Sequence, residues 1–248
     1  MSKVINELLK LKNKDKSKIL TRFFKTGKGE YGEGDVFLGI TVPVSRSIAK
    51  KYTHIDFKEI QELLNNKYHE ARLVALLILV QKYQKLTAPK QGLGASSPRS
   101  DLGEKSKIVK FYLKNTKYIN NWDLVDLSAH YILGDYLYKN KNLARTVLAR
   151  LAKSKNLWER RIAIISTFAF IYKKEADWTF KITDMLMKDK HDLIHKACGW
   201  MLREVGKRVD EKELLSYLDQ NSNKMPRTML RYAIERLPET KRLYYLNK

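Results

Sequence analysis

A repeat of 35 residues limits most strongly what this chain can fold into. Four charged residues recur at this spacing: Asp126, Arg161, Lys196 and Arg231. The residues two places after them are all small: Ser128, Ala163, Cys198 and Ala233. A unit of this length accommodates two helices of typical length and two turns. Since small side chains at one register let helices approach closely, the repeat predicts an array of stacked helix pairs.

Apolar residues follow a helical period over most of the chain. Examples are Ile60, Leu63 and Leu64, and later Leu148 and Leu151. Strand-like alternation bounded by hairpin turns is absent, and only five prolines and eleven glycines interrupt the pattern. The predicted class is therefore all-α, with residues 1–248 as one repeat domain.

One segment breaks the repeat. Glu70-Ala71-Arg72-Leu73 resembles the repeated helix, but Arg72 precedes Asp126 by 54 residues. Leaving out the 19 residues from 87 to 105, which are rich in Gly, Ser and Pro, restores the spacing of 35. We expect this segment to be a mobile surface insertion.

The charge favours a polyanionic partner. The chain holds 49 Lys and Arg against 27 Asp and Glu, a net charge of +22, and the basic residues are spread along its whole length. Phosphate contacts by such residues supply salt-dependent affinity, so we expect binding to a nucleic acid.

Other sequence features bear on the cellular compartment of the protein and on metal binding. The single cysteine, Cys198, excludes an intramolecular disulfide and a cysteine-based zinc site. The longest apolar run, Leu73–Val80, is too short to span a bilayer, and residues 1–16 lack a leader pattern. We expect a cytoplasmic monomer, associated with the nucleoid through DNA, that uses neither metal nor cofactor.

The repeat register predicts a row of basic side chains. Arg161, Lys196, Arg231 and, upstream, Arg72 would line up on one surface and suit a phosphate backbone. Asp126 shares the register but carries the opposite charge. It either forms a structural salt bridge with Arg161 or meets positive charge that develops on a substrate.

Aromatic and further basic residues accompany this row. Trp122 lies four residues before Asp126, and Trp200 four after Lys196, so each pair shares a helix face. An indole attracts cations and stacks on bases or sugars. Arg227 shares a helix face with Arg231 and either touches phosphate or lies on a solvated surface.

Four motifs follow one another along the chain: Phe37-Leu38-Gly39-Ile40-Thr41-Val42-Pro43, Asn121-Trp122-Asp123-Leu124-Val125-Asp126, Leu157-Trp158-Glu159-Arg160-Arg161-Ile162-Ala163 and Lys196-Ala197-Cys198-Gly199-Trp200-Met201-Leu202-Arg203-Glu204. In this order they resemble the AlkD-like DNA alkylation repair family, whose members are HEAT-like repeat DNA glycosylases that act on double-stranded DNA. The likeness covers nearly the whole chain except residues 87–105. It implies a HEAT-like α–α superhelix with a concave DNA-binding face.

The resemblance also implies a reaction and its residues. The family's activity is metal-free hydrolysis of the N-glycosidic bond of cationic N3- or N7-alkylated purines, without drawing the base into a protein pocket. Asp126, Trp122, Trp200 and Arg161 fall on its active-site positions. The resemblance also places Phe24 and Thr41 among the DNA-binding residues. Both depart from the family pattern in ways that concern lesion preference, since a tyrosine is also seen at the position of Phe24 and some members have glutamine at that of Thr41.

This chemistry suits the residues. A cationic purine leaves without a strong general acid, and an oxocarbenium-like sugar must be stabilised. Asp126 would offset that charge and position water, and Trp122 and Trp200 would hold the nucleotide. Arg161 would hold a flanking phosphate.

Two rival functions remain open. The first is a non-enzymatic protein of the same fold that binds damaged or branched DNA, and the second is a protein-interaction scaffold that binds acidic peptides. Two further patterns carry little weight: the Gly27–Gly32 spacing lacks a preceding strand, and His191 and His195 lack a third ligand.

Overall fold

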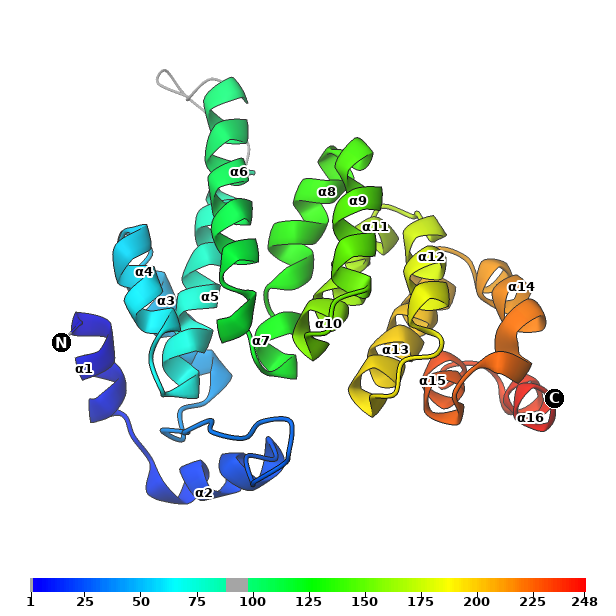
Figure 1. The fold of residues 1–248 in the computed structure, drawn as a ribbon, viewed down its shortest axis with the longest axis horizontal. Coiled ribbons are helices and arrows are strands. Elements are labelled where there is room, and N and C mark those ends of the chain that lie inside the picture. Colours follow the sequence, from blue (N-terminus) through cyan, green and yellow to red (C-terminus); the bar gives the residue numbers. More distant parts are fainter. Residues whose placement is uncertain (1, 88–97) are drawn as a thin grey trace. The chain divides into compact units, whose positions relative to one another are not determined.

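The computed structural model describes residues 2–87 and 98–248. These residues form helices and loops, with a single isolated β-bridge between Val36 and Tyr68 and no extended strand among them (Figure 1). The chain groups into two compact units, Met1–Ser128 and Ala129–Lys248. No helix in the described part is long and apolar enough to cross a membrane.

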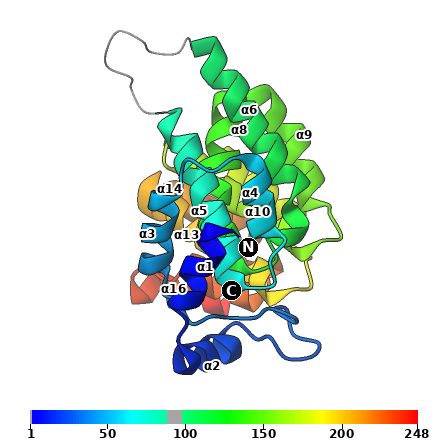
Figure 2. The ribbon, with the colours of Figure 1, turned by 90° about the vertical axis from the view of Figure 1, so that its left-hand side faces the viewer.

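The first unit is built around one buried helix. Its helices are α1 (Lys3–Lys10), α2 (Lys14–Phe23), α3 (Val42–Lys51), α4 (Phe57–Leu64), α5 (His69–Lys85), α6 (Pro98–Lys114), the 3-10 turn η1 (Thr116–Tyr118) and α7 (Trp122–Asp126). Helices α1, α3, α4, α6 and α7 all contact α5. Figure 2 shows α1, α3 and α4 around α5. Every residue of α5 from His69 to Val80 is buried, so this helix is stable only when surrounded in this way.

Helix α6 revises one expectation from the sequence. It begins at Pro98, so residues 98–105 are helical, whereas their composition predicts part of a surface insertion without helical period. Proline suits a first helical turn, and Asp101 supplies the acidic residue favoured there. The rest of the predicted insertion, residues 88–97, lies outside the described residues.

The segment between α2 and α3 runs close to the start of α2. Gly39 has φ +86°, and a Cβ there would lie 2.2 Å from the Asn13 carbonyl oxygen and 2.7 Å from the Ser17 nitrogen. The Ser17 hydroxyl donates to the Phe37 carbonyl at 2.7 Å, and the Asn13 N–H donates to the Leu38 carbonyl at 2.8 Å. Only glycine fits this conformation and this approach, which explains the F-L-G-I sequence.

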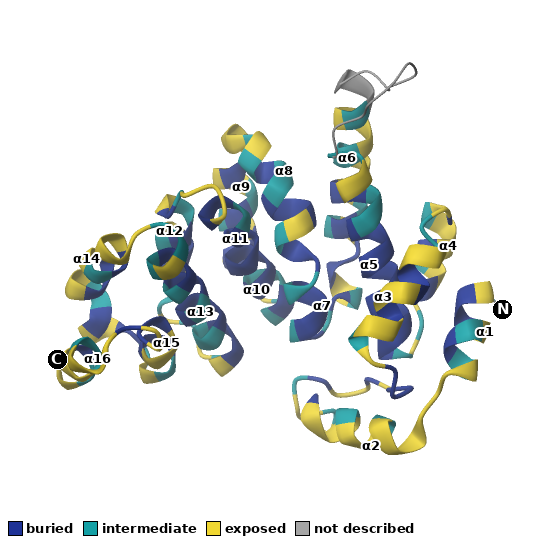
Figure 3. Cartoon of the chain, turned by 180° about the vertical axis from the view of Figure 1, so that it is seen from behind, coloured by how far each residue is buried: buried dark blue, intermediate teal, exposed yellow. Residues whose placement is uncertain are grey.

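The second unit contains the repeated helix pairs. Its helices are the π-helix η2 (His130–Gly134), α8 (Asp135–Lys139), α9 (Lys141–Ala152), α10 (Leu157–Ser166), α11 (Phe168–Ile171), α12 (Asp177–Leu186), α13 (Asp192–Arg208), α14 (Glu211–Asn221), the 3-10 turn η3 (Ser222–Lys224), α15 (Arg227–Ala233) and α16 (Glu239–Asn247). Helix α9 packs on α10, and α12 and α14 pack on α13. Helix α13 also lies between α10 and α15, and much of α10 and α13 is buried (Figure 3).

The small residues that recur with the repeat lie in the core of this unit. Ala163 on α10, Cys198 on α13 and Ala233 on α15 are all buried. The next residue, Gly199, approaches α15 so closely that a Cβ would lie 2.4 Å from the Met229 carbonyl oxygen. The prediction of an all-α fold of closely packed helix pairs is confirmed.

Candidate functional site

A cavity of about 510 Å³ lies in the first unit, between α2, the segment that leads to α3, and the starts of α5 and α7. Most of its lining is apolar or aromatic: Ile19, Leu20, Phe23, Phe24, Phe37, Gly39, Ile40, Val42, Leu73, Trp122 and Leu127. The polar lining residues are Lys16, Thr41, His69, Glu70, Asp123 and Asp126. A mostly apolar cavity with a few converging polar groups is typical of a ligand site.

Four residues singled out from the sequence meet at this cavity: Phe24, Thr41, Trp122 and Asp126. Two of them stand at opposite ends of the one-turn helix α7, which begins at Trp122 and ends at Asp126. The Asn121 side chain accepts a hydrogen bond from the Trp122 N–H at 2.8 Å and so caps this helix. Trp122 and Asp126 are half-buried, four residues apart, and therefore on one helix face.

A stack of rings forms one wall. The Phe24 ring is stacked on Trp122, with centroids 5.1 Å apart and planes at 17°, and on Phe37 at 4.9 Å and 20°. Phe37 is in turn stacked on the His69 ring at 4.4 Å and 24°. Phe23 meets Trp122 edge to face at 5.9 Å, although its side chain is largely exposed. Phe24 is thus a buried support for the Trp122 indole.

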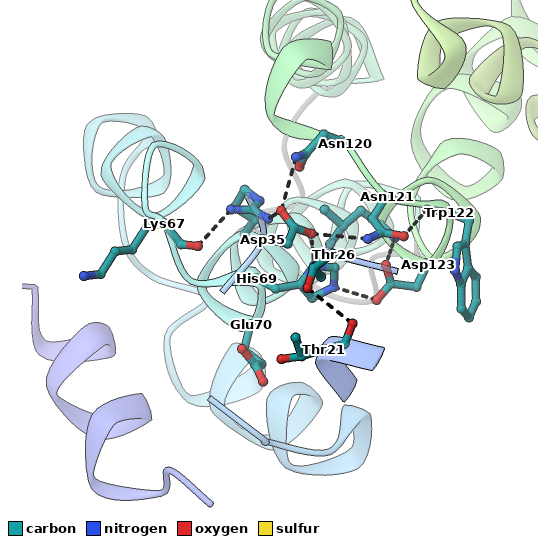
Figure 4. Close-up of polar contacts among 12 residues, drawn as sticks. Thr21, Thr26, Asp35, Lys67, His69, Glu70, Asn120, Asn121, Trp122 and Asp123 are labelled. Carbon is teal, nitrogen blue, oxygen red and sulfur yellow. Dashed lines mark hydrogen bonds and ion pairs between the residues drawn. The ribbon is translucent and has the colours of Figure 1, made fainter. Parts of the chain in front are cut away.

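A network of buried charges lies beneath this wall, and no sequence pattern indicated it (Figure 4). The His69 ring bonds to Asp35 through Nδ1 at 2.9 Å and to Asp123 through Nε2 at 2.8 Å. Asp35 also accepts hydrogen bonds from the Arg72 guanidinium and, at 3.2 Å each, from the Asn120 and Asn121 side-chain amides. The network therefore links α5, the α2–α3 segment and the start of α7.

Two pKa values in this network are shifted, those of His69 and Asp35. Burial alone would lower the pKa of His69, but the carboxylates of Asp123 and Asp35 outweigh it and raise the pKa to about 9. Burial opposes ionisation of Asp35, yet the hydrogen bond from His69 and the charge of Arg72 bring its pKa below the usual value. His69 is therefore a cation between two carboxylates at neutral pH.

Glu70 is a second buried carboxylate at the cavity. It accepts hydrogen bonds from three consecutive backbone N–H groups, those of Leu38 (2.9 Å), Gly39 (2.8 Å) and Ile40 (3.1 Å). Its side chain ties α5 to the F-L-G-I segment. Glu70 and Asp123 are thus engaged in buried contacts, whereas the half-buried Asp126 is nearer to solvent.

In the second unit, Trp200 is oriented by a neighbouring acid. Its indole N–H donates to the Glu204 carboxylate at 3.3 Å, and its ring meets Phe168 edge to face at 5.8 Å. Arg208 also donates to Glu204, at 2.6 Å, and covers the Phe168 and Tyr172 rings. The spacing of Trp200, Glu204 and Arg208, each four residues apart, signals this arrangement on α13.

The residues of the predicted basic row differ in their exposure to solvent, and two of them are buried. Arg72 and Arg161 are only 6% and 5% exposed. Arg72 donates to the backbone carbonyls of Asn66 and Lys67 as well as to Asp35, and Arg161 donates to the Leu193 carbonyl at 2.6 Å. These contacts argue against phosphate binding by either guanidinium, because a buried charge is costly to separate from its partners.

Lys196 and Arg231 of that row, and Arg227 on the same helix as Arg231, are better placed for a phosphate. Lys196 is half-buried and forms an ion pair with Asp192 at 2.8 Å. Arg227 and Arg231 are exposed at the start and near the end of α15, and Arg227 donates to the Leu246 carbonyl at 3.0 Å. Phosphate binding by these three residues stays a prediction.

The paired histidines and the lone cysteine have structural explanations. His191 caps α13 by accepting from the Leu193 N–H at 3.2 Å, and the His195 ring bonds to the Asp189 carbonyl oxygen at 2.6 Å. Within residues 2–87 and 98–248, no group of three or more His, Cys, Asp or Glu side chains could hold a metal ion. Cys198 is fully buried, and this burial raises the pKa of its thiol.

The fold and the cavity together define an all-helical repeat protein with an aromatic cavity beside a carboxylate. The family described as DNA alkylation repair enzyme matches residues 4–237. The chain therefore belongs to this family of DNA alkylation repair enzymes, as its motifs indicate.

Two solved structures share the fold. A predicted DNA alkylation repair enzyme from Enterococcus faecalis has a TM-score of 0.66 at 17% identity, over 92% of this chain and 97% of that one. AlkD2 from Streptococcus mutans has a TM-score of 0.52 at 16% identity, over 90% and 98%. A search among curated proteins found no match.

Proposed function

We propose that the protein is a DNA glycosylase that hydrolyses the N-glycosidic bond of cationic N3- or N7-alkylated purines in duplex DNA. The observation that carries this proposal is the arrangement of α7 at the cavity. Asp126 and Trp122 line the same cavity from one helix face, beside Phe24 and Thr41. An aromatic ring and a carboxylate side by side suit a cationic nucleotide.

The proposed reaction needs little from a general acid. As the C1′–N bond breaks, its electron pair goes to the purine, which loses its positive charge, and the sugar becomes oxocarbenium-like. The Asp126 carboxylate would stabilise that charge and orient a water molecule. The water oxygen then bonds to C1′, and its proton passes to Asp126 or to solvent.

The neighbouring residues bear on which side chains contact the substrate. The neighbouring acids Asp123 and Glu70 hold buried hydrogen bonds, so they are poorly placed to leave them for a substrate. Trp122 is backed by Phe24 and would present its indole to the cationic nucleotide. The roles predicted for Trp200 as a second aromatic contact, and for Lys196, Arg227 and Arg231 as phosphate contacts, rest on the sequence and on their placement in the second unit.

The test is release of free base from methylated duplex DNA by the wild-type protein and by Asp126→Asn. We expect 7-methylguanine or 3-methyladenine to be released by the wild type. We expect Asp126→Asn to lower the single-turnover rate by at least about 100-fold, since it removes a charge that opposes the transition-state charge. Asp177→Asn, the same change at an exposed residue of α12, should leave the rate unaltered.

The contrary outcomes separate the rival functions. Near-normal excision by Asp126→Asn would exclude the role given to Asp126. No release by the wild type together with salt-sensitive binding to duplex DNA would favour the non-enzymatic DNA-binding protein. Weak DNA binding at physiological salt with binding of acidic peptides would favour the protein-interaction scaffold.

A further inference from the structure

The buried network beside the cavity has a charge balance that depends on one histidine. His69, Asp35 and Asp123 are 1%, 7% and 7% exposed, and Arg72 is 6% exposed. If His69 were neutral, the two carboxylates and the one guanidinium would leave this buried group with one negative charge in excess. Because an uncompensated buried charge is strongly destabilising, neutrality requires His69 to carry the missing charge.

The hydrogen bonds lead to the same protonation state. A neutral imidazole has one N–H, but both ring nitrogens of His69 lie within 3 Å of a carboxylate oxygen, at 2.9 Å from Asp35 and 2.8 Å from Asp123. In a neutral ring, one nitrogen lone pair would face a carboxylate lone pair at that distance. Only the doubly protonated ring donates to both carboxylates.

The two carboxylates are attached to different parts of the site. Asp123 belongs to the first turn of α7, and its other oxygen accepts from the Leu124 N–H at 2.8 Å. Asp35 holds the Asn121 side chain, which in turn caps α7 at Trp122. His69 belongs to the buried helix α5 and is linked to α7 in two ways. It bonds directly to Asp123, and it bonds through Asp35 to Asn121, the N-cap residue of α7.

We propose that His69, as an imidazolium held between Asp35 and Asp123, is a positioning residue that fixes helix α7 and thereby the placement of Trp122 and Asp126 at the cavity. This inference deepens the proposed glycosylase and rests on it for the effect on excision. His69 borders the cavity, but its ring is 1% exposed and both of its nitrogens are bonded to Asp35 and Asp123, so it acts through α7 and the ring stack.

The first experiment needs no variant. The imidazole signals of His69 are followed by NMR as the pH of the wild-type protein is raised, with assignment through the backbone. The charged groups that face this ring are Asp35 from the α2–α3 segment and Asp123 from α7, with Arg72 beyond Asp35 on α5 itself. We expect the ring to stay doubly protonated through pH 8, and titration below pH 7 would overturn the proposal.

The second experiment separates positioning from general stability. The indole N–H signal of Trp122, assigned by its loss in Trp122→Phe, should shift in His69→Gln. The matched variant His54→Gln replaces an exposed histidine and should leave the signal in place. We expect His69→Gln to lower the single-turnover excision rate roughly 10- to 100-fold, with the Kd for DNA changed less than about 3-fold.

The outcomes distinguish the two proposals. If the wild type excises base and His69→Gln does so at the same rate with an unmoved Trp122 signal, the positioning role is wrong and the glycosylase stands. If the wild type excises nothing, the glycosylase fails, and the titration and the Trp122 signal still decide whether His69 fixes α7.

A double variant provides the test if His69→Gln folds poorly. In this variant, loss of the His69 charge is balanced by loss of the Asp35 charge. Replacing Asp35 with Asn in the same protein leaves Arg72 and Asp123 as one cation and one anion. We expect Asp35→Asn/His69→Gln to melt at a higher temperature than His69→Gln alone. A double variant no more stable than the single one would contradict the requirement for the imidazolium charge.

Discussion

At the scale of single residues, the Glu70 carboxylate explains why the F-L-G-I segment has its sequence. Three successive backbone N–H groups, from Leu38 to Ile40, converge on it. This convergence uses the left-handed backbone of Gly39, and the same segment contributes Phe37 and Thr41 to the cavity lining. Hydrogen bonds to a charged acceptor in a buried setting are among the stronger ones in proteins.

We therefore expect Glu70→Gln to destabilise the protein by about 2 kcal/mol, because an amide group would face the Leu38 N–H and the acceptor charge would be lost. Urea unfolding followed by circular dichroism measures the change. Glu62→Gln, at an exposed position of α4, serves as the control and should alter stability little. Equal stability of the two variants would mean that the Glu70 contacts contribute nothing net.

At the scale of elements, the close packing of α13 on α15 depends on the absence of a side chain at Gly199. A Cβ there would meet the Met229 carbonyl oxygen at 2.4 Å and the Tyr232 Cβ at 2.5 Å. A backbone atom cannot rotate away as a flexible side chain can, so the two helices would have to separate. Close helix contacts of this kind explain why the repeat keeps small residues at one register.

The matched substitutions Gly199→Ala and Gly103→Ala test this packing. Alanine favours a helix over glycine by about 1 kcal/mol, and a Cβ at Gly103 on α6 meets nothing within 4 Å. We expect Gly103→Ala to stabilise the protein slightly and Gly199→Ala to destabilise it by roughly 1–3 kcal/mol through overpacking. Thermal melting of both variants is the measurement, and a gain in stability from Gly199→Ala would show that α15 can move at little cost.

At the scale of the whole molecule, the net charge of +22 is the property that a DNA backbone would meet first. Each phosphate that a cationic side chain neutralises releases condensed counterions, so affinity falls with salt. Several lysines and arginines already form ion pairs on the surface, for example Lys196 with Asp192 and Arg242 with Glu239. Only cations that can leave such partners, or that lack competing acids, contribute to this dependence.

We expect affinity for undamaged duplex DNA to fall roughly 1,000-fold between 50 and 200 mM salt if about six phosphates are contacted. Arg231→Ala should weaken binding to all sequences alike and reduce the logarithmic salt slope by about 1. Arg242→Ala, which removes an arginine paired with Glu239, is the control. Fluorescence anisotropy across a salt series gives both quantities, and an unchanged slope in Arg231→Ala would remove this residue from the DNA contacts.

The helical class, the repeat and the shared helix face of Trp122 and Asp126 can be predicted without the structure. Helical period and a recurring small register are local properties, because they follow from which side of a helix is buried and how closely the next helix approaches. For the same reason, the spacing of Trp122 and Asp126 alone places them on one helix face. Phe24 and Thr41, two positions taken from the family resemblance, line the same cavity as Trp122 and Asp126, and a functional role for these residues stays a prediction.

The partners and the burial of the charged residues, by contrast, could not be predicted from the sequence. Repeat register placed Arg72 and Arg161 in a basic row, yet both are buried and bonded within the protein. His69 meets Asp35 and Asp123 across 34 and 54 residues of chain, and no periodic pattern indicates this contact. The helical period of a sequence indicates which side of a single helix is buried. A buried ion network depends instead on which distant elements pack together, and this packing arises only when the chain folds.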